Sequence, residues 1–120
     1  MKIIIVTKPA DELKNPTTGD YWRDTDGTAN VAVQELGDED YEFLIGIHSL
    51  IEGKLIEHNK INIQKIAYFN EEFKLKRGDS PRIPGDDPGD DPLSPYHREH
   101  IFATFIEMQI AKEFNISWKT

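Results

Sequence analysis

The chain contains no cysteine, and this absence removes several kinds of chemistry at once. Disulfide bonds, thiolate metal sites and cysteine nucleophiles are all excluded. A chain without disulfides fits a reducing compartment. The N-terminal apolar run, residues 3–6, is too short for a signal peptide and is followed at once by charged residues. We therefore expect a protein that stays in the cytoplasm.

Long apolar runs are missing as well, because no stretch reaches the roughly 20 residues that a membrane-spanning helix needs. The sequence also lacks a glycine-rich phosphate loop, a G-x-G-x-x-G fingerprint and a G-x-S-x-G nucleophile elbow. These absences count against the commonest nucleotide-binding and serine-hydrolase patterns. We expect no membrane contact.

Positive charge is scarce relative to negative charge. The chain has 14 lysines and arginines against 22 aspartates and glutamates, a formal net charge of −8. Phosphate backbones repel such a chain, so nucleic-acid binding is disfavoured. An acidic balance instead suits cation binding or a basic protein partner.

The 120 residues, of which 38% are hydrophobic, are enough for one domain with its own core, spanning 1–120. Residues 2–7 are apolar and β-branched, which predicts a strand covered on both faces. Residues 20–24 and 28–35 flank Asp26-Gly27, a favoured hairpin turn. The pattern predicts an α+β fold, with a small antiparallel or mixed sheet of about three strands followed by three helices.

Capping and helix-ending residues predict where each of the three helices begins and ends. Asp38 is placed to cap the first, which is predicted to stop at Asn59. Asn62 is placed to cap the second, which ends by Gly78. Ser94 and Pro95 have the character of a cap and a first helical position, so the third helix is predicted from there to about residue 114. The apolar side chains at helical spacing, predicted to enter the core, are Leu44, Ile47, Ile51, Leu55, Ile66, Phe69, Phe73, Leu75, Ile101, Phe102, Phe105, Ile106, Met108 and Ile110.

Residues 78–95 form an acidic loop rich in proline and glycine inside the domain. It contains the tandem sequence GDDPGDDP, and proline at this density opposes regular structure. The acidic side chains there are Asp86, Asp87, Asp90 and Asp91, which offer oxygen ligands for calcium or magnesium. Their spacing is not that of a calcium loop, so we favour a solvated loop.

The first and third helices each carry a polar stripe. His48 and Glu52 are four residues apart, and the third helix repeats polar side chains at three- and four-residue spacing. Small residues accompany both stripes and would let two helices approach closely: Gly46, Ser49 and Gly53 on the first, Ala103 and Ala111 on the third. We therefore expect the two stripes to converge.

Two imidazoles with one or two carboxylates suit zinc, iron or manganese. We predict that His48, Glu52 and His100 are the ligands of such a divalent metal, and that Glu107 is a fourth ligand or orients a histidine. The residues predicted to lie directly behind the ligands are Ser49, His97 and Thr104.

Two other interpretations are compatible with the same residues. The histidines and carboxylates can form a buried hydrogen-bond network that only fixes helix packing. Alternatively, the protein binds or sequesters without chemistry, as an inhibitor of a host protein or a binder of a small nucleotide-like ligand.

Two long stretches resemble a family of small proteins of phages and of bacterial genomes that carry phage DNA, without an assigned function. The stretches are GDYWRDTDGTANVAVQELGDEDYEFLIGIHSLIE and DDPLSPYHREHIFATFIEMQIAKEFNISW. Members of that family show helices of the form H-E-L-x-E and P-Y-x-x-x-H-x-x-A-x-x-I-E. The matching positions are His48, Ser49, Glu52, Pro95, Tyr96, His100, Ala103, Ile106 and Glu107.

The resemblance implies a shared site rather than a known activity. It also implies a phage-encoded protein that acts in the host cytoplasm. This sequence departs from the family at Ser49, where the family pattern tends to have glutamate. In zinc peptidases that glutamate is the general base, and a serine hydroxyl is too weak a base to replace it. The site is therefore expected to be zincin-like in pattern without the usual catalyst.

Overall fold

The computed structural model describes residues 1–13, 18–78 and 87–118. Its elements in chain order are β1 (Ile3–Lys8), the short 3₁₀ helix η1 (Ala10–Glu12), β2 (Gly19–Arg23), β3 (Ala29–Gln34), α1 (Glu39–His58), α2 (Ile63–Arg77), the 3₁₀ helix η2 (Pro88–Asp90) and α3 (His97–Glu113). The predicted α+β fold is confirmed, with a mixed three-stranded sheet and three α-helices in the described residues.

The strands are ordered β1-β3-β2, with β1 parallel and β2 antiparallel to β3. The predicted hairpin connects β2 and β3. Its turn closes where the N–H of Gly27 donates to the carbonyl of Asp24 at 2.9 Å. Gly27 has a φ of 88°, a conformation that glycine adopts without steric cost.

Strand β1 is not covered on both sides as expected. Within the described residues it lies at the edge of the sheet, where it pairs with β3, and Ile3, Ile5 and Val6 are exposed. Helix α1 packs on β2 and β3, and its Gly46 also lies close to Ile5 of β1. The most buried of the three strands is β3, whose Val31 and Val33 form the core with Leu44.

Helix α1 begins where sequence predicted, because the Asp38 carboxylate accepts from the N–H groups of Asp40 and Tyr41. Its glycines, however, face the sheet and not α3. A Cβ at Gly53 would overlap the ring of Tyr21, and one at Gly46 would lie 3.2 Å from Ile5. The expectation that these glycines let α3 approach was therefore wrong, and they let α1 sit on the sheet.

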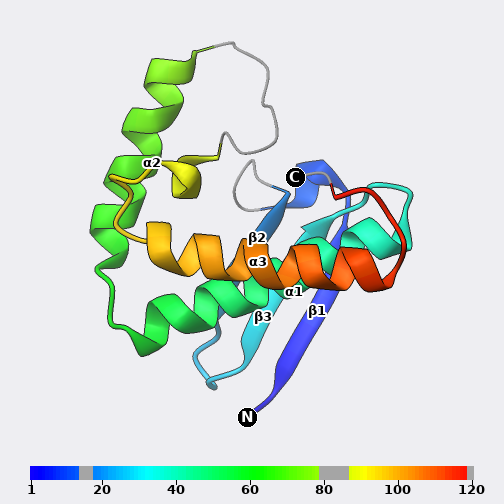
Figure 1. Ribbon diagram of the computed structural model, residues 1–120. Coiled ribbons are helices and arrows are strands. Elements are labelled where there is room, and N and C mark those ends of the chain that lie inside the picture. Colours follow the sequence, from blue (N-terminus) through cyan, green and yellow to red (C-terminus); the bar gives the residue numbers. More distant parts are fainter. Residues whose placement is uncertain (14–17, 79–86, 119–120) are drawn as a thin grey trace.

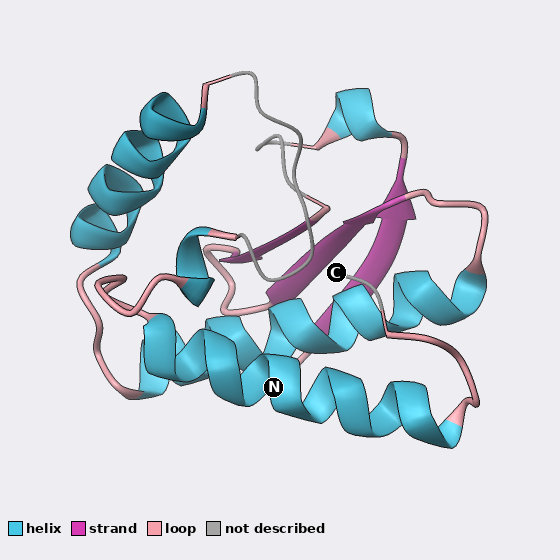
Figure 2. Ribbon diagram, turned by 45° about the horizontal axis from the view of Figure 1, so that its top comes forward, coloured by secondary structure: helices cyan, strands magenta, loops and turns pink. Residues whose placement is uncertain are grey.

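Helix α3, which is orange in Figure 1, packs along α1, which is cyan to green there. Figure 2 shows the same two helices side by side in the lower part of the view. The two helices are antiparallel, since His48 pairs with Glu107 while Glu52, further along α1, pairs with His100. Ala103 and Ala111 are fully buried in this seam, as the small-residue pattern predicted for α3.

Helix α3 starts later than predicted, at His97 and not at Pro95. The Ser94 hydroxyl accepts from the N–H of Tyr96 at 3.3 Å, and this contact closes a turn before the helix instead of capping it. Helix α2 keeps its predicted cap at Asn62 and its end at Gly78, but none of its residues is fully buried and Leu75 is exposed.

The apolar side of α3 was expected in the core, but the structure exposes four of its six residues and leaves Ile106 and Ile110 half-buried. The exposed residues are Ile101, Phe102, Phe105 and Met108. The buried residues of this helix are instead Glu99, His100, Ala103, Glu107 and Ala111. Of the helices in the described ranges, none has both the length and the apolar character needed to cross a bilayer.

Candidate metal site between helices α1 and α3

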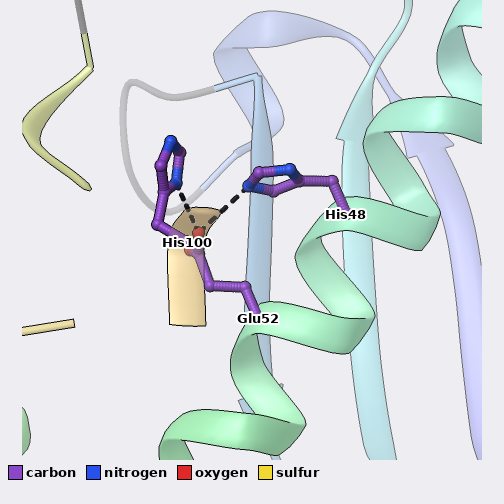
Figure 3. A group of neighbouring side chains, drawn as sticks. All are labelled: His48, Glu52 and His100. Atoms are coloured by element: carbon purple, nitrogen blue, oxygen red, sulfur yellow. Dashed lines mark hydrogen bonds and ion pairs between the residues drawn. The ribbon is translucent and has the colours of Figure 1, made fainter. Parts of the chain in front are cut away.

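Three predicted ligands converge in the seam between α1 and α3. His48 Nε2 lies 3.0 Å from Glu52 Oε2, and His100 Nδ1 lies 2.7 Å from the same oxygen. Figure 3 shows both rings turned toward this carboxylate, one from α1 and one from α3. One ligand atom from each of the three residues lies within 4.8 Å of the others. This spacing lets one ion contact all three.

The local sequence explains how two of the three ligands, His48 and Glu52, come together. His48 and Glu52 are four residues apart on α1, so their side chains lie one turn apart on one helix face. His100 comes from the first turn of α3 and reaches the pair because the two helices are antiparallel. Its side chain is only 8% exposed, whereas the Glu52 side chain is 21% exposed. Of the three ligands, Glu52 is therefore the most exposed and His100 the least.

Each histidine turns its second ring nitrogen to another carboxylate. His100 Nε2 lies 3.0 Å from Asp90 Oδ1 on η2. His48 Nδ1 lies 2.9 Å from Glu107 Oε1, which is close enough for an ion pair. The contact does not have the geometry of a hydrogen bond. Histidines that bind metals usually have a carboxylate or carbonyl on the second nitrogen, which fixes the ring orientation.

Glu107 is the most buried charged residue of the site, at 2% exposure. Its second oxygen accepts a hydrogen bond of 2.9 Å from the indole Nε1 of Trp118, near the end of the described chain. The carboxylate is therefore held from both sides, by a ring of α1 and by the segment after α3. It faces the outer nitrogen of His48 and orients that ring.

The short helix η2 brings Asp90 to the site, so the expectation of a solvated acidic loop was wrong for this residue. The N–H of Asp87 donates to Asp90 Oδ2 at 2.9 Å, which fixes the carboxylate. Gly89 lies against the His100 ring, and a Cβ there would overlap the ring. His97 Nδ1 donates to the carbonyl of Gly89 at 2.9 Å and joins η2 to α3. Asp86 lies outside the described residues.

Asp87, Asp90 and His100 form a second group whose ligand atoms lie within 4.8 Å of one another. This group shares His100 with the first. Because the Nδ1 of that ring already points at Glu52, only Nε2 faces the aspartates. The simplest reading of the two contacts is that Asp90 orients His100 for the first group.

The carboxylates strongly perturb the titration of the two rings. Burial alone would lower the pKa of His48, but Glu107 and Glu52 outweigh it and raise that pKa to about 10. Burial would likewise lower the pKa of His100, but the hydrogen bond with Glu52 outweighs burial and raises that pKa. Burial would raise the pKa of Glu52, but hydrogen bonds from His100 and His48 lower it to about 2. Without metal, the His48 ring is therefore protonated at neutral pH, and the pKa of His100 is shifted in the same direction.

The two remaining predicted residues, Ser49 and Thr104, lie elsewhere, as does His58, a histidine outside the prediction. Ser49 lies against Gly19 of β2, on the sheet side of α1, so its hydroxyl is turned away from the three ligands. Thr104 is half-buried on α3. His58, at the end of α1, is exposed and lies outside the cluster. Ser49 therefore does not take the place that a general base would need.

Sequence reasoning missed Asp90 as a partner of His100 and gave Trp118 no contact with Glu107. No local pattern could have shown either, because both contacts join different segments of the chain. Comparisons with family models, with curated proteins and with solved structures returned no match to this chain. The phage-family resemblance stays a prediction.

Proposed function

We propose that this protein binds one divalent metal ion through His48, Glu52 and His100. The observation that carries the proposal is the double contact of each ring. One nitrogen of each histidine faces the same Glu52 oxygen, and the other faces a separate carboxylate. A packing network needs only one partner per ring, whereas oriented metal ligands usually have this second contact.

The donor set fits zinc, iron(II) or manganese(II), which are commonly held by two imidazoles and one carboxylate. An ion there would replace the protons now held between the rings and Glu52, and it would cross-link α1 to α3. Three protein ligands leave room for water on the ion. Ser49 is turned toward the sheet, so the usual base of zinc peptidases has no counterpart at that position.

The test is metal content with matched histidine variants. Protein purified without chelator and without a histidine tag should hold close to one zinc, iron or manganese ion per chain by elemental analysis. The variant His100→Ala should lose that ion. The control His58→Ala removes an exposed histidine outside the cluster and should keep it. Because an ion bound only to the folded state stabilises it, the chelator should lower the melting temperature of the wild type but not of His100→Ala.

Cobalt(II) gives an independent readout, because its visible absorption reports coordination directly. We expect wild type and His58→Ala to give bands of bound cobalt, and His100→Ala to give none. Two results would refute the proposal: equal metal content in both variants, or no bound metal and no stabilisation of the wild type by added ions. The cluster would then be a hydrogen-bond network that orders the helices.

A second candidate function is binding of a small molecule without chemistry, and one cleft favours it. A cleft of about 500 Å³ lies between α2 and the segment before α3, and the residues that line it do not include a histidine. Tyr68 and Phe69 offer flat apolar surfaces there, and Lys65 offers a positive charge. This combination suits a flat, anionic, nucleotide-like ligand. A nucleotide screen on chelator-treated protein tests it, since stabilisation without metal belongs to this candidate alone.

A host protein as partner and a phage origin are further proposals, which rest on the resemblance in the two helix patterns. A basic partner would suit the net charge of −8. Affinity capture from bacterial lysate with the full chain tests the partner, and loss of the captured protein at raised salt is the expected signature of charge pairing.

A further inference from the structure

The segment that follows α3 turns back toward the buried cluster, as the red trace in Figure 1 shows. Asn115 has a φ of 56°, in the left-handed region that often ends a helix. Its N–H donates to the carbonyl of Lys112 at 3.1 Å, and the N–H of Ile116 donates to that of Ala111 at 3.1 Å. This pair of hydrogen bonds defines a Schellman motif, which reverses the chain at this point.

Two contacts with the start of α1 hold the returning segment in place. The hydroxyl of Tyr41 donates to the carbonyl of Ser117 at 2.6 Å. The rings of Phe43 and Phe114 lie 5.8 Å apart, at a distance typical of aromatic pairs. We call residues 114–118 the C-terminal strap. Its position is therefore set by α1 as well as by α3.

The strap delivers one side chain, Trp118, to the carboxylate behind His48. The indole Nε1 donates to Glu107 Oε2 at 2.9 Å, and the other oxygen, Oε1, lies 2.9 Å from His48 Nδ1. An indole N–H can only donate, so it occupies one oxygen and leaves the other for the ring. Since Glu107 is only 2% exposed, water competes little for either oxygen. Trp118 therefore fixes how the carboxylate faces His48.

We infer that Trp118 is a positioning residue of the metal site, and that docking of the C-terminal strap and metal binding strengthen each other. The inference rests on the proposed function. An ion on Nε2 of His48 leaves the ring proton on Nδ1 and polarises it, so the contact with Glu107 becomes stronger. A carboxylate already held by the indole makes that contact without turning. By linkage, an ion that gains affinity from the docked strap must stabilise the strap equally.

Zinc affinity of the full chain, measured by competition with a chromophoric chelator, tests the inference. Trp118→Phe keeps an aromatic ring and removes the N–H donor. It should weaken zinc binding about tenfold, the lower end of the effect of groups that orient metal ligands. Trp22→Phe is the matched control, because the Trp22 indole donates to Asp24 on the surface, and it should leave the affinity unchanged. A merely structural role of Trp118 would lower the melting temperature without changing the affinity of the folded protein.

Fluorescence tests the reverse direction of the coupling. The chain has two tryptophans, so Trp118 is the only one left in Trp22→Phe. Zinc should shift its emission to shorter wavelength and reduce its quenching by acrylamide, because the ion stabilises the docked strap. His100→Ala in the same background lacks a metal ligand and should show neither change.

Tyr41→Phe gives a second variant that leaves Trp118 intact. It removes the hydroxyl that anchors the strap at Ser117, so it should weaken zinc binding in the same direction as Trp118→Phe and by less. A wild type that binds zinc, with unchanged affinity in Trp118→Phe and in Tyr41→Phe, overturns the inference and leaves the metal site standing. A wild type that binds no zinc, iron or manganese refutes the proposed function, and the inference with it.

Discussion

The two faces of α3 are built in opposite ways. The inner face buries Glu99, His100 and Glu107 against α1 and its neighbours, whereas the outer face exposes Phe102 and Phe105. Each buried polar group has a partner: Glu99 accepts from the Asn59 amide at 2.7 Å, and the others join the metal cluster. The helix is thus polar inside and apolar outside.

This contrast shows that apolar character alone does not decide which side of a helix faces inward. Burial of a charged group without a partner costs several kilocalories per mole, but that penalty is offset when oriented partners are available. Here the partners come from α1, η2 and the segment after α3. The small residues Ala103 and Ala111 then let the polar seam close.

Removing one buried carboxylate is the strongest test of the contrast between the two faces of α3. Glu107→Ala would leave His48 Nδ1 and Trp118 Nε1 facing a cavity, so we expect a loss of about 3–5 kcal/mol in the free energy of unfolding. The measurement is urea unfolding of chelator-treated protein. Glu113→Ala changes an exposed glutamate of the same helix and should cost less than about 0.5 kcal/mol. Equal effects in the two variants would contradict the stabilising role of Glu107.

Titration of the cluster tests its electrostatics without any substitution. Since the pKa of His48 is about 10 in the folded chain and its ordinary value is 6.5, its contribution is complete below pH 6.5 and is lost as pH rises through 10. The pKa of Glu52 is about 2 against 4.5, so its contribution is complete above pH 4.5 and is lost as pH falls through 2.

The groups that face these two are Glu107 and His100 from α3, with Asp90 of η2 behind His100. We therefore expect the free energy of unfolding of chelator-treated protein to be highest between about pH 4.5 and 6.5 and to fall by a few kcal/mol toward pH 10. His48→Gln should flatten the alkaline decline. A decline of the same size in that variant would assign it to other groups.

A pair of size changes gives the smallest expected effect and compares the two faces directly. Ala103→Leu adds volume to the inner face, where the residue is fully buried, and should cost about 1–3 kcal/mol by overpacking. Phe105→Leu changes the exposed outer face and should shift the unfolding of dilute protein by less than about 0.5 kcal/mol. Thermal or urea unfolding at low micromolar concentration measures both. A larger cost for Phe105→Leu would mean that the outer face is covered.

Much of the fold could be predicted from local patterns. The caps Asp38 and Asn62, the helix ends at Asn59 and Gly78, and the hairpin at Gly27 agree with the structure because each depends on neighbouring residues. The pairing of His48 with Glu52 was predictable for the same reason. The predicted start of α3 was two residues too early, because Ser94 closes a turn where a helix cap had been expected.

The sequence by itself determined the three strands and three α-helices, their order and the His48–Glu52 pair, since hydrogen bonds and side-chain periodicity act over a few residues. Only the tertiary structure decided which face of α3 is buried, which side the glycines of α1 serve, and that Asp90 and Trp118 join the cluster. Those outcomes depend on partners 10 or more residues away, as Asp90 and His100 are. Whether a buried charge is stable depends on such partners, and the local sequence does not contain them.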